Sequence, residues 1–177
     1  MTVKTTTCKD FCVSGEERQR LLGAVLAALR ADGIARDALD QAVADRLGIN
    51  LTDLRCLDVL DQRGTTTAGD LAAALGLTTG AVTTLLDRVE RGGYVRRIRD
   101  AQDRRRVLVE LTERCRRLTE ELYGPLGEEG YALLSDYESR DLELIRDFLV
   151  ASRELQLRHE RRIRSSAPAA PRARRAR

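Results

Sequence analysis

Residues 67–111 read TAGDLAAALGLTTGAVTTLLDRVERGGYVRRIRDAQDRRRVLVEL, and this stretch decides the fold of the chain. A first short helix is expected to begin at a Thr67 cap, and Thr78 can cap a second helix. Gly76 stands between them, where the chain must take a left-handed turn that a residue without Cβ adopts at little cost. The pattern predicts a helix-turn-helix. Apolar residues recur at helical spacing and should form the buried faces of both helices: Leu71, Ala72, Leu75, Val82, Leu85, Leu86 and Val89.

A β-hairpin is expected immediately after the second helix. Gly92 and Gly93 end that helix, and residues 94–99 and 106–111 read as two strands around the polar turn 100–103. A helix-turn-helix that runs directly into such a hairpin is a winged helix. Residues 65–67 form either a minor extra strand of this wing or, as is more common for so short a run of Thr, a connector.

Further helices are expected on both sides of the winged helix. Residues 16–30 and 34–47 read as two helices separated at Asp32-Gly33, and residues 52–62 read as a third. After the wing, a long helix at residues 113–134 should be kinked or bent at Pro125. A last helix starts at Ser139 or Asp141. The fold class is therefore mainly α with a small β-hairpin wing, as a winged helix-turn-helix lobe plus a helical dimerisation lobe.

The dimerisation lobe is inferred from long apolar stripes on the flanking helices. In the last helix the stripe runs along one side through Leu142, Ile145, Phe148, Leu149 and Leu155. A two-helix lobe cannot bury so long a stripe by itself. We therefore expect the first helix and the last two to form a homodimer with a second copy of the chain.

The net charge of +3 is unevenly distributed along the chain. Residues 88–106 contain eight Arg against three acidic residues, a net charge of +5, and residues 158–177 contain eight Arg against Glu160, a net charge of +7. The rest of the chain then carries −9. Two basic zones on an acidic body predict a polyanionic partner, and the first zone coincides with the expected wing.

Several short segments resemble the MarR family of bacterial transcriptional regulators, from about residue 47 to residue 118. The most specific is the wing sequence Asp103-Arg104-Arg105, whereas Cys115 stands where the family usually has Gly after its Leu-Thr pair. The resemblance implies a dimer that binds double-stranded DNA at a pseudo-palindromic operator. It further implies a repressor that is released by a small-molecule effector. The other matching segments are Gly76-Leu77-Thr78, Val82-Thr83, Leu86-Asp87-Arg88-Val89-Glu90, Gly93-Tyr94-Val95-Arg96-Arg97 and Leu111-Thr112.

The second helix of the motif is expected to lie in the major groove of DNA. Backbone N–H groups of Thr79 and Gly80 at its positive end can bind a phosphate, and the Thr83 and Thr84 side chains can meet bases. Arg88 should reach phosphate or be held by a carboxylate such as Asp87 or Asp103. The predicted DNA-binding residues are Thr78, Thr79, Gly80, Thr83, Thr84, Arg88, Arg97, Arg104 and Arg105.

The wing should supply much of the affinity for DNA. Arg104 and Arg105 at the hairpin turn are placed to enter the minor groove. The arginines along the strands should divide between phosphate contacts and pairing with acidic helices.

These assignments predict the following division of the chain. Residues 1–14 form a flexible N-terminal segment, and residues 15–48 form the N-terminal helices of the dimerisation lobe. Residues 49–111 form the winged helix-turn-helix DNA-binding lobe, and residues 112–164 add the C-terminal helices of the dimerisation lobe. Residues 165–177 form a disordered basic tail, which is either a solubilising end or a loose phosphate contact.

The cysteines leave one alternative function open. Cys56 and Cys115 lie on apolar helix faces and are expected to be buried, whereas Cys8 and Cys12 precede the first helix. The alternative is a thiol-based redox-sensing regulator that uses Cys8 and Cys12.

Other functional classes are not expected. His159 is the one histidine and no paired CxxC exists, so no metal site is predicted. The sequence has no Ser/His/Asp set and no phosphate-cradling Gly loop, so we expect neither an enzyme nor a cofactor. No apolar run approaches the length of a membrane span, which predicts a cytoplasmic protein without a membrane partner.

Overall fold

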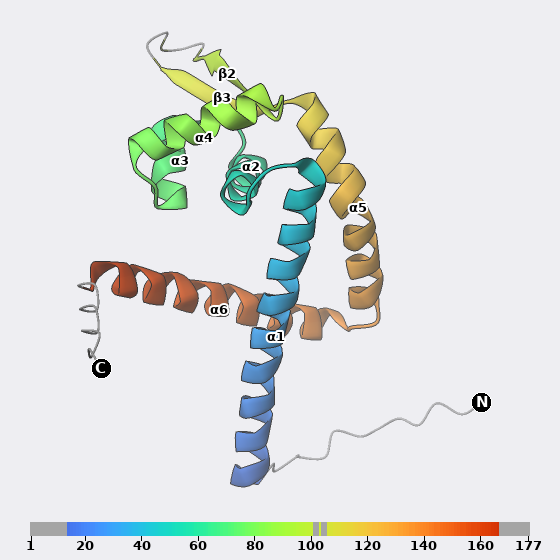
Figure 1. The fold of residues 1–177 in the computed structure, drawn as a ribbon. Helices are drawn as coiled ribbons and strands as arrows, with labels where there is room; N and C mark the ends of the chain where they lie inside the picture. The colour runs from blue at the N-terminus through green and yellow to red at the C-terminus, as the bar shows by residue number, and fades with distance from the viewer. Residues whose placement is uncertain (1–13, 101–102, 104–105, 167–177) are drawn as a thin grey trace, which may run out of the picture. The chain divides into compact units, whose positions relative to one another are not determined.

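A computed structural model of the chain describes residues 14–100, 103 and 106–166 (Figure 1). The described chain is mainly helical, with one small antiparallel sheet, which confirms the predicted fold class. It divides into two compact units, residues 1–122 and residues 123–177. The elements in chain order are α1 (Gly15–Leu47), α2 (Leu51–Arg63), β1 (Thr66–Thr67), α3 (Ala68–Leu75), α4 (Thr79–Arg91), β2 (Val95–Arg99), β3 (Val107–Leu111), α5 (Glu113–Ser135) and α6 (Ser139–Ser165).

The helix-turn-helix consists of α3 and α4, which meet at an angle of 108°. Thr67 caps α3 by accepting a hydrogen bond from the Asp70 N–H at 3.1 Å, and Thr78 caps α4 by accepting one from the Ala81 N–H at 3.3 Å. Gly76 between them has φ of +65°, in the left-handed region that favours glycine. The caps and the turn predicted from the sequence are confirmed.

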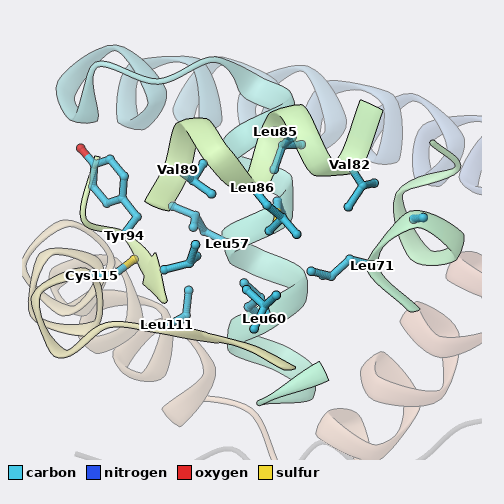
Figure 2. Packing of buried hydrophobic residues seen from close by; sticks show 14 residues of the cluster. Leu57, Leu60, Leu71, Val82, Leu85, Leu86, Val89, Tyr94, Leu111 and Cys115 are labelled. Atoms are coloured by element: carbon cyan, nitrogen blue, oxygen red, sulfur yellow. The ribbon is translucent and has the colours of Figure 1, made fainter. Parts of the chain in front are cut away.

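The core of the first unit lies where α2, α3, α4, the sheet and the start of α5 meet (Figure 2). Every residue predicted for the buried faces of the helix-turn-helix is buried except Leu75, which is partly buried against the same core. Cys56 and Cys115 are buried in this cluster, as expected. The cluster fixes the orientation of α4, so its opposite face is turned toward solvent. The labelled core residues are Leu57, Leu60, Leu71, Val82, Leu85, Leu86, Val89, Tyr94, Leu111 and Cys115.

The wing is the antiparallel hairpin β2–β3, and β1 adds a short third strand in the order β1-β3-β2. The register pairs Val95 with Leu111 and Arg97 with Val109. Of these, Val95, Val109 and Leu111 are buried, as the two-residue period of a strand with one covered face requires. The run at residues 65–67 therefore includes a strand and is not only a connector.

The predicted break at Asp32-Gly33 is wrong, because α1 is one continuous helix of 33 residues. An interior glycine costs a helix only about 1 kcal/mol relative to alanine. Asp32 and Arg36 form an i,i+4 ion pair across this position at 3.1 Å, which favours the helix. α5 is assigned as one helix that contains Pro125, and the kink or bend expected there stays a prediction.

Candidate nucleic-acid interface

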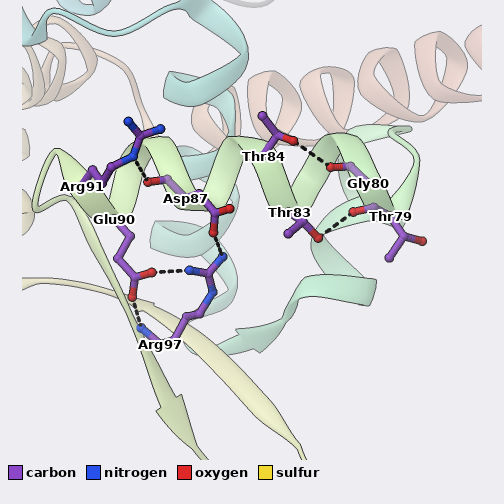
Figure 3. A network of polar contacts seen from close by, with 8 residues as sticks. All are labelled: Thr79, Gly80, Thr83, Thr84, Asp87, Glu90, Arg91 and Arg97. Atoms are coloured by element: carbon purple, nitrogen blue, oxygen red, sulfur yellow. Dashed lines mark hydrogen bonds and ion pairs between the residues drawn. The ribbon is translucent and has the colours of Figure 1, made fainter.

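One face of α4 is polar and exposed. Val82, Leu85, Leu86 and Val89 are buried, so the intervening positions point away from the core. Figure 3 shows most of these residues along α4. The exposed residues of this face are Thr79, Gly80, Thr83, Thr84, Asp87, Arg88 and Arg91.

The N-terminus of α4 offers donors that the helix itself does not use. Thr78 accepts the Ala81 N–H, and the Val82 N–H is the first to bond a backbone carbonyl, that of Thr78. Within the described residues, the N–H groups of Thr79 and Gly80 have no acceptor. A Cβ built on Gly80 would meet no atom within 4 Å, so the backbone is open to approach there. Free N–H groups at the positive end of a helix are suited to bind an anion such as phosphate.

The hydroxyl groups of Thr83 and Thr84 are turned back toward their own helix. The Thr83 hydroxyl donates to the Thr79 carbonyl at 3.0 Å, and the Thr84 hydroxyl donates to the Gly80 carbonyl at 3.2 Å (Figure 3). Each hydroxyl hydrogen is thereby occupied, whereas the oxygen lone pairs remain accessible because both residues are exposed. In this geometry the two side chains present hydrogen-bond acceptors and methyl groups to a partner.

Arg88 is held by a carboxylate on another helix. Its Nε donates to Oδ2 of Asp53 at 2.7 Å and its Nη2 donates to Oδ1 at 2.5 Å. Asp53 belongs to α2 and its side chain has no exposed surface, whereas 44% of the Arg88 side chain is exposed. The hydrogen bond to Asp53 raises the pKa of Arg88 above its ordinary value, so the guanidinium stays charged. The alternative that a carboxylate holds Arg88 is realised, but by Asp53 rather than by Asp87 or Asp103.

Arg97 joins the wing to α4. Its Nη2 donates to Oδ1 of Asp87 at 2.6 Å and its Nη1 donates to Oε2 of Glu90, both on α4 (Figure 3). Its backbone N–H donates to the other Glu90 oxygen at 3.1 Å. Burial lowers the pKa of Arg97, but the Asp87 hydrogen bond and the charges of Glu90 and Asp87 outweigh it and raise the pKa. In this structure Arg97 therefore braces β2 against α4, and its contact with DNA stays a prediction.

The other arginines of the wing differ in how they are held. Arg96 donates from Nε to Oε1 of Glu110 at 2.6 Å, across the strand pair. Nη1 of Arg106 lies 3.9 Å from Oδ2 of Asp100 at the other end of the hairpin. Arg99 is exposed and has no ion-pair partner within the described part of the chain. Arg104 and Arg105, the two residues predicted for the minor groove, lie outside the described residues.

Two residues that shape this surface, Arg91 and Asp53, were not predicted from the sequence. Arg91 is exposed on α4, where its Nε donates to the Asp87 carbonyl at 3.0 Å. Its spacing from Gly80, Thr84 and Asp87 is helical and would have placed it on the same face. Asp53 carried no comparable signal, because it lies 35 residues from Arg88.

The two cysteines among the described residues are not suited to act as nucleophiles. Burial raises the pKa of the Cys56 thiol to about 12 and also raises that of Cys115, so both are poor nucleophiles. Cys8 and Cys12 lie outside the described residues, and the redox alternative stays untested. Over the described residues, no group of His, Cys, Asp or Glu is arranged to hold a metal ion.

No single helix of the described chain is both long and apolar enough to cross a membrane. Among the described helices, the bent pair α3–α4 reaches the necessary length and composition when its two members are taken together.

Sequence comparisons match the part of the chain that contains this surface to a known family. A sequence model of the MarR family matches residues 49–107. The HTH-type transcriptional regulator YcgE of Bacillus subtilis (strain 168), itself described as uncharacterized, is 42% identical over 109 residues, which cover 62% of this chain and 71% of YcgE. YfiV of the same organism, described in the same words, is 30% identical over 141 residues, which cover 80% of each chain.

Solved structures have the same fold. A point mutant of MepR from a multidrug-resistant S. aureus clinical isolate superimposes with a TM-score of 0.61 at 24% identity, covering 75% of this chain and 96% of MepR. NadR, solved in complex with 4-hydroxyphenylacetate, is 28% identical with a TM-score of 0.51, covering 66% of this chain and 85% of NadR.

Proposed function

The chain belongs to the MarR family of DNA-binding transcriptional regulators, and from that premise we propose that it is a dimeric repressor of a pseudo-palindromic operator. The family is one of transcriptional regulators, not of enzymes. The observation that carries the proposal is the exposed polar face of α4, with unused N–H groups at its first turn.

In the proposed complex α4 lies in the major groove. Its 13 residues span about 20 Å, at about 1.5 Å per residue, which suits a groove about 12 Å wide. The Thr78 cap exposes the N–H groups of Thr79 and Gly80 to a phosphate. The Thr83 and Thr84 oxygens accept from the amino groups of adenine or cytosine, and their methyl groups contact thymine.

The arginines of α4 have different tasks in this proposal. Arg88 keeps α4 in place through Asp53 and turns the exposed part of its guanidinium to a phosphate. Arg91 reaches phosphate or a base edge at the other end of the helix. Because Arg91 is the one long cation of this face that no carboxylate holds within the described residues, we expect α4 to discriminate modestly between bases.

The wing is proposed to enter the neighbouring minor groove through Arg104 and Arg105. The support is the way the hairpin is anchored: Arg97 ties β2 to α4, and the pair Arg96–Glu110 ties β2 to β3. The strands that lead to these two residues are thus anchored to α4 and to each other, which supports the hairpin as part of the DNA-binding surface. Arginine in a narrow minor groove gains from the concentrated negative potential there.

A second copy of the chain is proposed to cover the apolar surface of the outer helices. Each unit exposes a row of large apolar side chains along one helix. Monomeric soluble proteins rarely expose large contiguous apolar patches. In the second unit Leu134, Leu142, Ile145 and Leu149 line an open groove of about 500 Å³. A two-fold dimer would present two α4 helices to half-sites about one helical turn apart. The exposed residues are Leu21, Leu22, Val25, Leu26 and Ile34 on α1 and Leu144, Phe148, Leu149, Val150 and Leu155 on α6.

We also propose release from DNA by a small carboxylic acid. NadR, the relative at 28% identity, was solved with 4-hydroxyphenylacetate. In the first unit of this chain a hollow of about 170 Å³ is lined by two cations, Arg46 and Arg114, by one carboxylate, Glu121, and by Tyr94 and the apolar side chains of Leu47, Leu118 and Leu122. Cations beside apolar walls suit a small organic anion.

The experiment that tests the function is selection of bound sequences from random duplex DNA by the full chain. An inverted repeat is the expected result, and sedimentation of the complex should give two chains per duplex. Recovery of no sequence preference, with weak binding to every duplex, would contradict the proposal.

A double variant of α4 tests whether the Thr83 and Thr84 hydroxyl oxygens contact bases. Thr83→Val with Thr84→Val keeps the shape and the methyl groups but removes both acceptors. It should change the preferred bases in each half-site while leaving the repeat spacing unchanged. Thr119→Val, on α5, is the matched control and should leave the selected sequence as it is.

A further inference from the structure

The outward face of α4 has a carboxylate near its middle line. Four exposed residues of the helix follow each other at spacings of four, three and four, so at about 3.6 residues per turn they form one row along it. This row lies opposite the buried face of the helix. Asp87 therefore projects in the direction in which α4 would meet a partner. The row consists of Gly80, Thr84, Asp87 and Arg91.

Bracing the wing does not by itself account for Asp87. Glu90 already binds Arg97 twice, because Oε2 accepts from Nη1 and Oε1 accepts from the backbone N–H at 3.1 Å. Asp87 contributes only Oδ1, which accepts from Nη2 of Arg97 at 2.6 Å (Figure 3). Within the described residues no hydrogen-bond donor reaches its Oδ2, and 52% of the side chain is exposed. One oxygen of an oriented carboxylate is thus available to a partner of α4.

The contact with Arg97 also makes an acidic side chain tolerable at this place. A carboxylate that faces DNA is repelled by the phosphates unless its charge is offset. The Arg97 guanidinium offsets the charge of Asp87 and fixes the direction of its side chain at the same time.

The row also permits a close approach to a groove. Asp has a short side chain, so it reaches a base edge only when the helix lies near the floor of the groove. Gly80 and Thr84, which precede Asp87 in the row, are small, and a Cβ built on Gly80 would meet no atom within 4 Å. No bulky side chain of the row therefore keeps the first part of α4 away from the bases.

We propose that Asp87 selects a cytosine in each half-site: Oδ2 accepts a hydrogen bond from the N4 amino group of the base, while Arg97 holds Oδ1. This inference rests on the proposed function, because it needs α4 to lie in the major groove. Asp87 is the residue that touches the base. Arg97 is a positioning residue that acts through Asp87.

Cytosine is the base that fits an acceptor without a donor beside it. A carboxylate oxygen can only accept a hydrogen bond. In the major groove guanine offers the acceptors N7 and O6, and thymine offers the acceptor O4 and a methyl group. Adenine has the amino group N6, but its acceptor N7 lies next to it and repels a carboxylate. Cytosine offers its N4 amino group without such a neighbour.

The test determines which sequences the full chain and its variants select from random duplex DNA. Asp87→Ala removes the carboxylate, and Asp87→Asn keeps its size but replaces one oxygen by an amino group. Glu90→Gln is the matched control, because it removes an equal charge from the same end of α4 and from the same arginine. Circular dichroism and thermal unfolding establish that each variant is folded.

The unmodified chain should select a C·G pair at one position of each half-site, and another pair there should lower its affinity by about tenfold. Asp87→Ala should remove the preference at this position alone. In Asp87→Asn the amide oxygen stays with Arg97 and the amino group donates where Oδ2 accepted. The preference should therefore change to a base with an acceptor, guanine or thymine. Glu90→Gln should select the same sequence as the unmodified chain.

A further variant tests the positioning role of Arg97. Arg97→Met should weaken the preference for cytosine when Asp87 is present. It should have no effect on the base chosen at this position when it is combined with Asp87→Ala, because Arg97 acts there only through Asp87. An equal effect in both backgrounds would contradict the positioning role.

Other results overturn the base contact. An unchanged selected sequence in both Asp87 variants would do so, as would an equal loss of affinity for every duplex, which a purely structural role of Asp87 predicts. The same change of base in Glu90→Gln would assign the effect to local charge. An inverted repeat that does not depend on Asp87 would defeat only this inference, whereas no sequence preference in the unmodified chain would defeat the proposed function itself.

Discussion

Arg88 and Asp53, which stand 35 residues apart, form a two-pronged ion pair between α4 and α2. The carboxylate is completely buried and the guanidinium is partly exposed. The backbone N–H of Asp53 is bonded in turn to the side chain of Asn50, which caps α2. Helix α4 is therefore fixed to α2 by a charged contact as well as by the apolar core.

Arg88→Met should lower the free energy of unfolding by about 2 to 3 kcal/mol, because it leaves the Asp53 carboxylate buried without its cation. The measurement is urea unfolding at one fixed protein concentration, since a dimer would make stability depend on concentration. Arg91→Met is the matched control on the same helix and should change stability by less than about 0.5 kcal/mol. Equal effects of the two variants would contradict a structural role for the pair.

Gly80→Ala should separate stability from DNA binding. Alanine has room at this helical position and should stabilise the fold by about 0.5 to 1 kcal/mol. Its methyl group would also keep a phosphate away from the first turn of α4, and we expect operator affinity to fall by about threefold to tenfold, equivalent to about 1 kcal/mol. Gly23→Ala, in α1 with equal space, should stabilise without weakening DNA binding. Thermal unfolding and fluorescence anisotropy measure the two effects, and a Gly80 variant with full affinity would argue against phosphate binding at this helix end.

Arg105→Ala should weaken operator binding at least about tenfold and leave the fold intact, because it removes a cation from the minor groove. Affinity is measured by gel shift at moderate salt, and the fold by circular dichroism. Arg36→Ala removes an equal charge from the exposed side of α1 and serves as the control. Unchanged affinity of the Arg105 variant would exclude the wing tip from the DNA contact.

Asp58 should make stability depend on pH. Burial, with the nearby charges of Asp40 and Asp61, raises the pKa of Asp58 to about 6. The folded state therefore binds the proton more tightly than the unfolded state does, and the stability this contributes is fully present below about pH 4 and is lost as the pH rises through about 6. Asp58→Asn should remove this dependence and stabilise the protein by about 1 to 2 kcal/mol at neutral pH, after allowance for partial solvent access. Urea unfolding across this pH range provides the measurement, and parallel profiles for the two proteins would refute the assignment.

The local features of the winged helix were predictable from sequence. The caps at Thr67 and Thr78, the left-handed Gly76 and the buried face of α4 all depend on residues within one or two helical turns of each other. Such short-range requirements leave a direct trace in residue type and spacing. The outward position of Thr83 and Thr84 followed from the same period.

The expected break in α1 shows where prediction from a few neighbouring residues fails. Asp-Gly is a common helix terminator, but here the helix continues and Asp32 pairs with Arg36 one turn later. A cost of about 1 kcal/mol for one glycine is small beside the gain from an uninterrupted helix. Whether such a signal ends a helix is therefore decided by the energy of the whole element.

The sequence by itself determined which face of α4 is exposed, where this helix begins and that many arginines lie near it in the chain. Only the tertiary structure decided which cations are committed within the protein: Arg88 to Asp53, Arg97 to Asp87 and Glu90, and Arg96 to Glu110. The physical reason is that an ion pair forms between groups within about 4 Å, and packing of α2 and the hairpin against α4 sets those distances. Arginines look alike along a chain, and their different tasks arise only when folding brings a carboxylate to some of them and leaves others facing solvent.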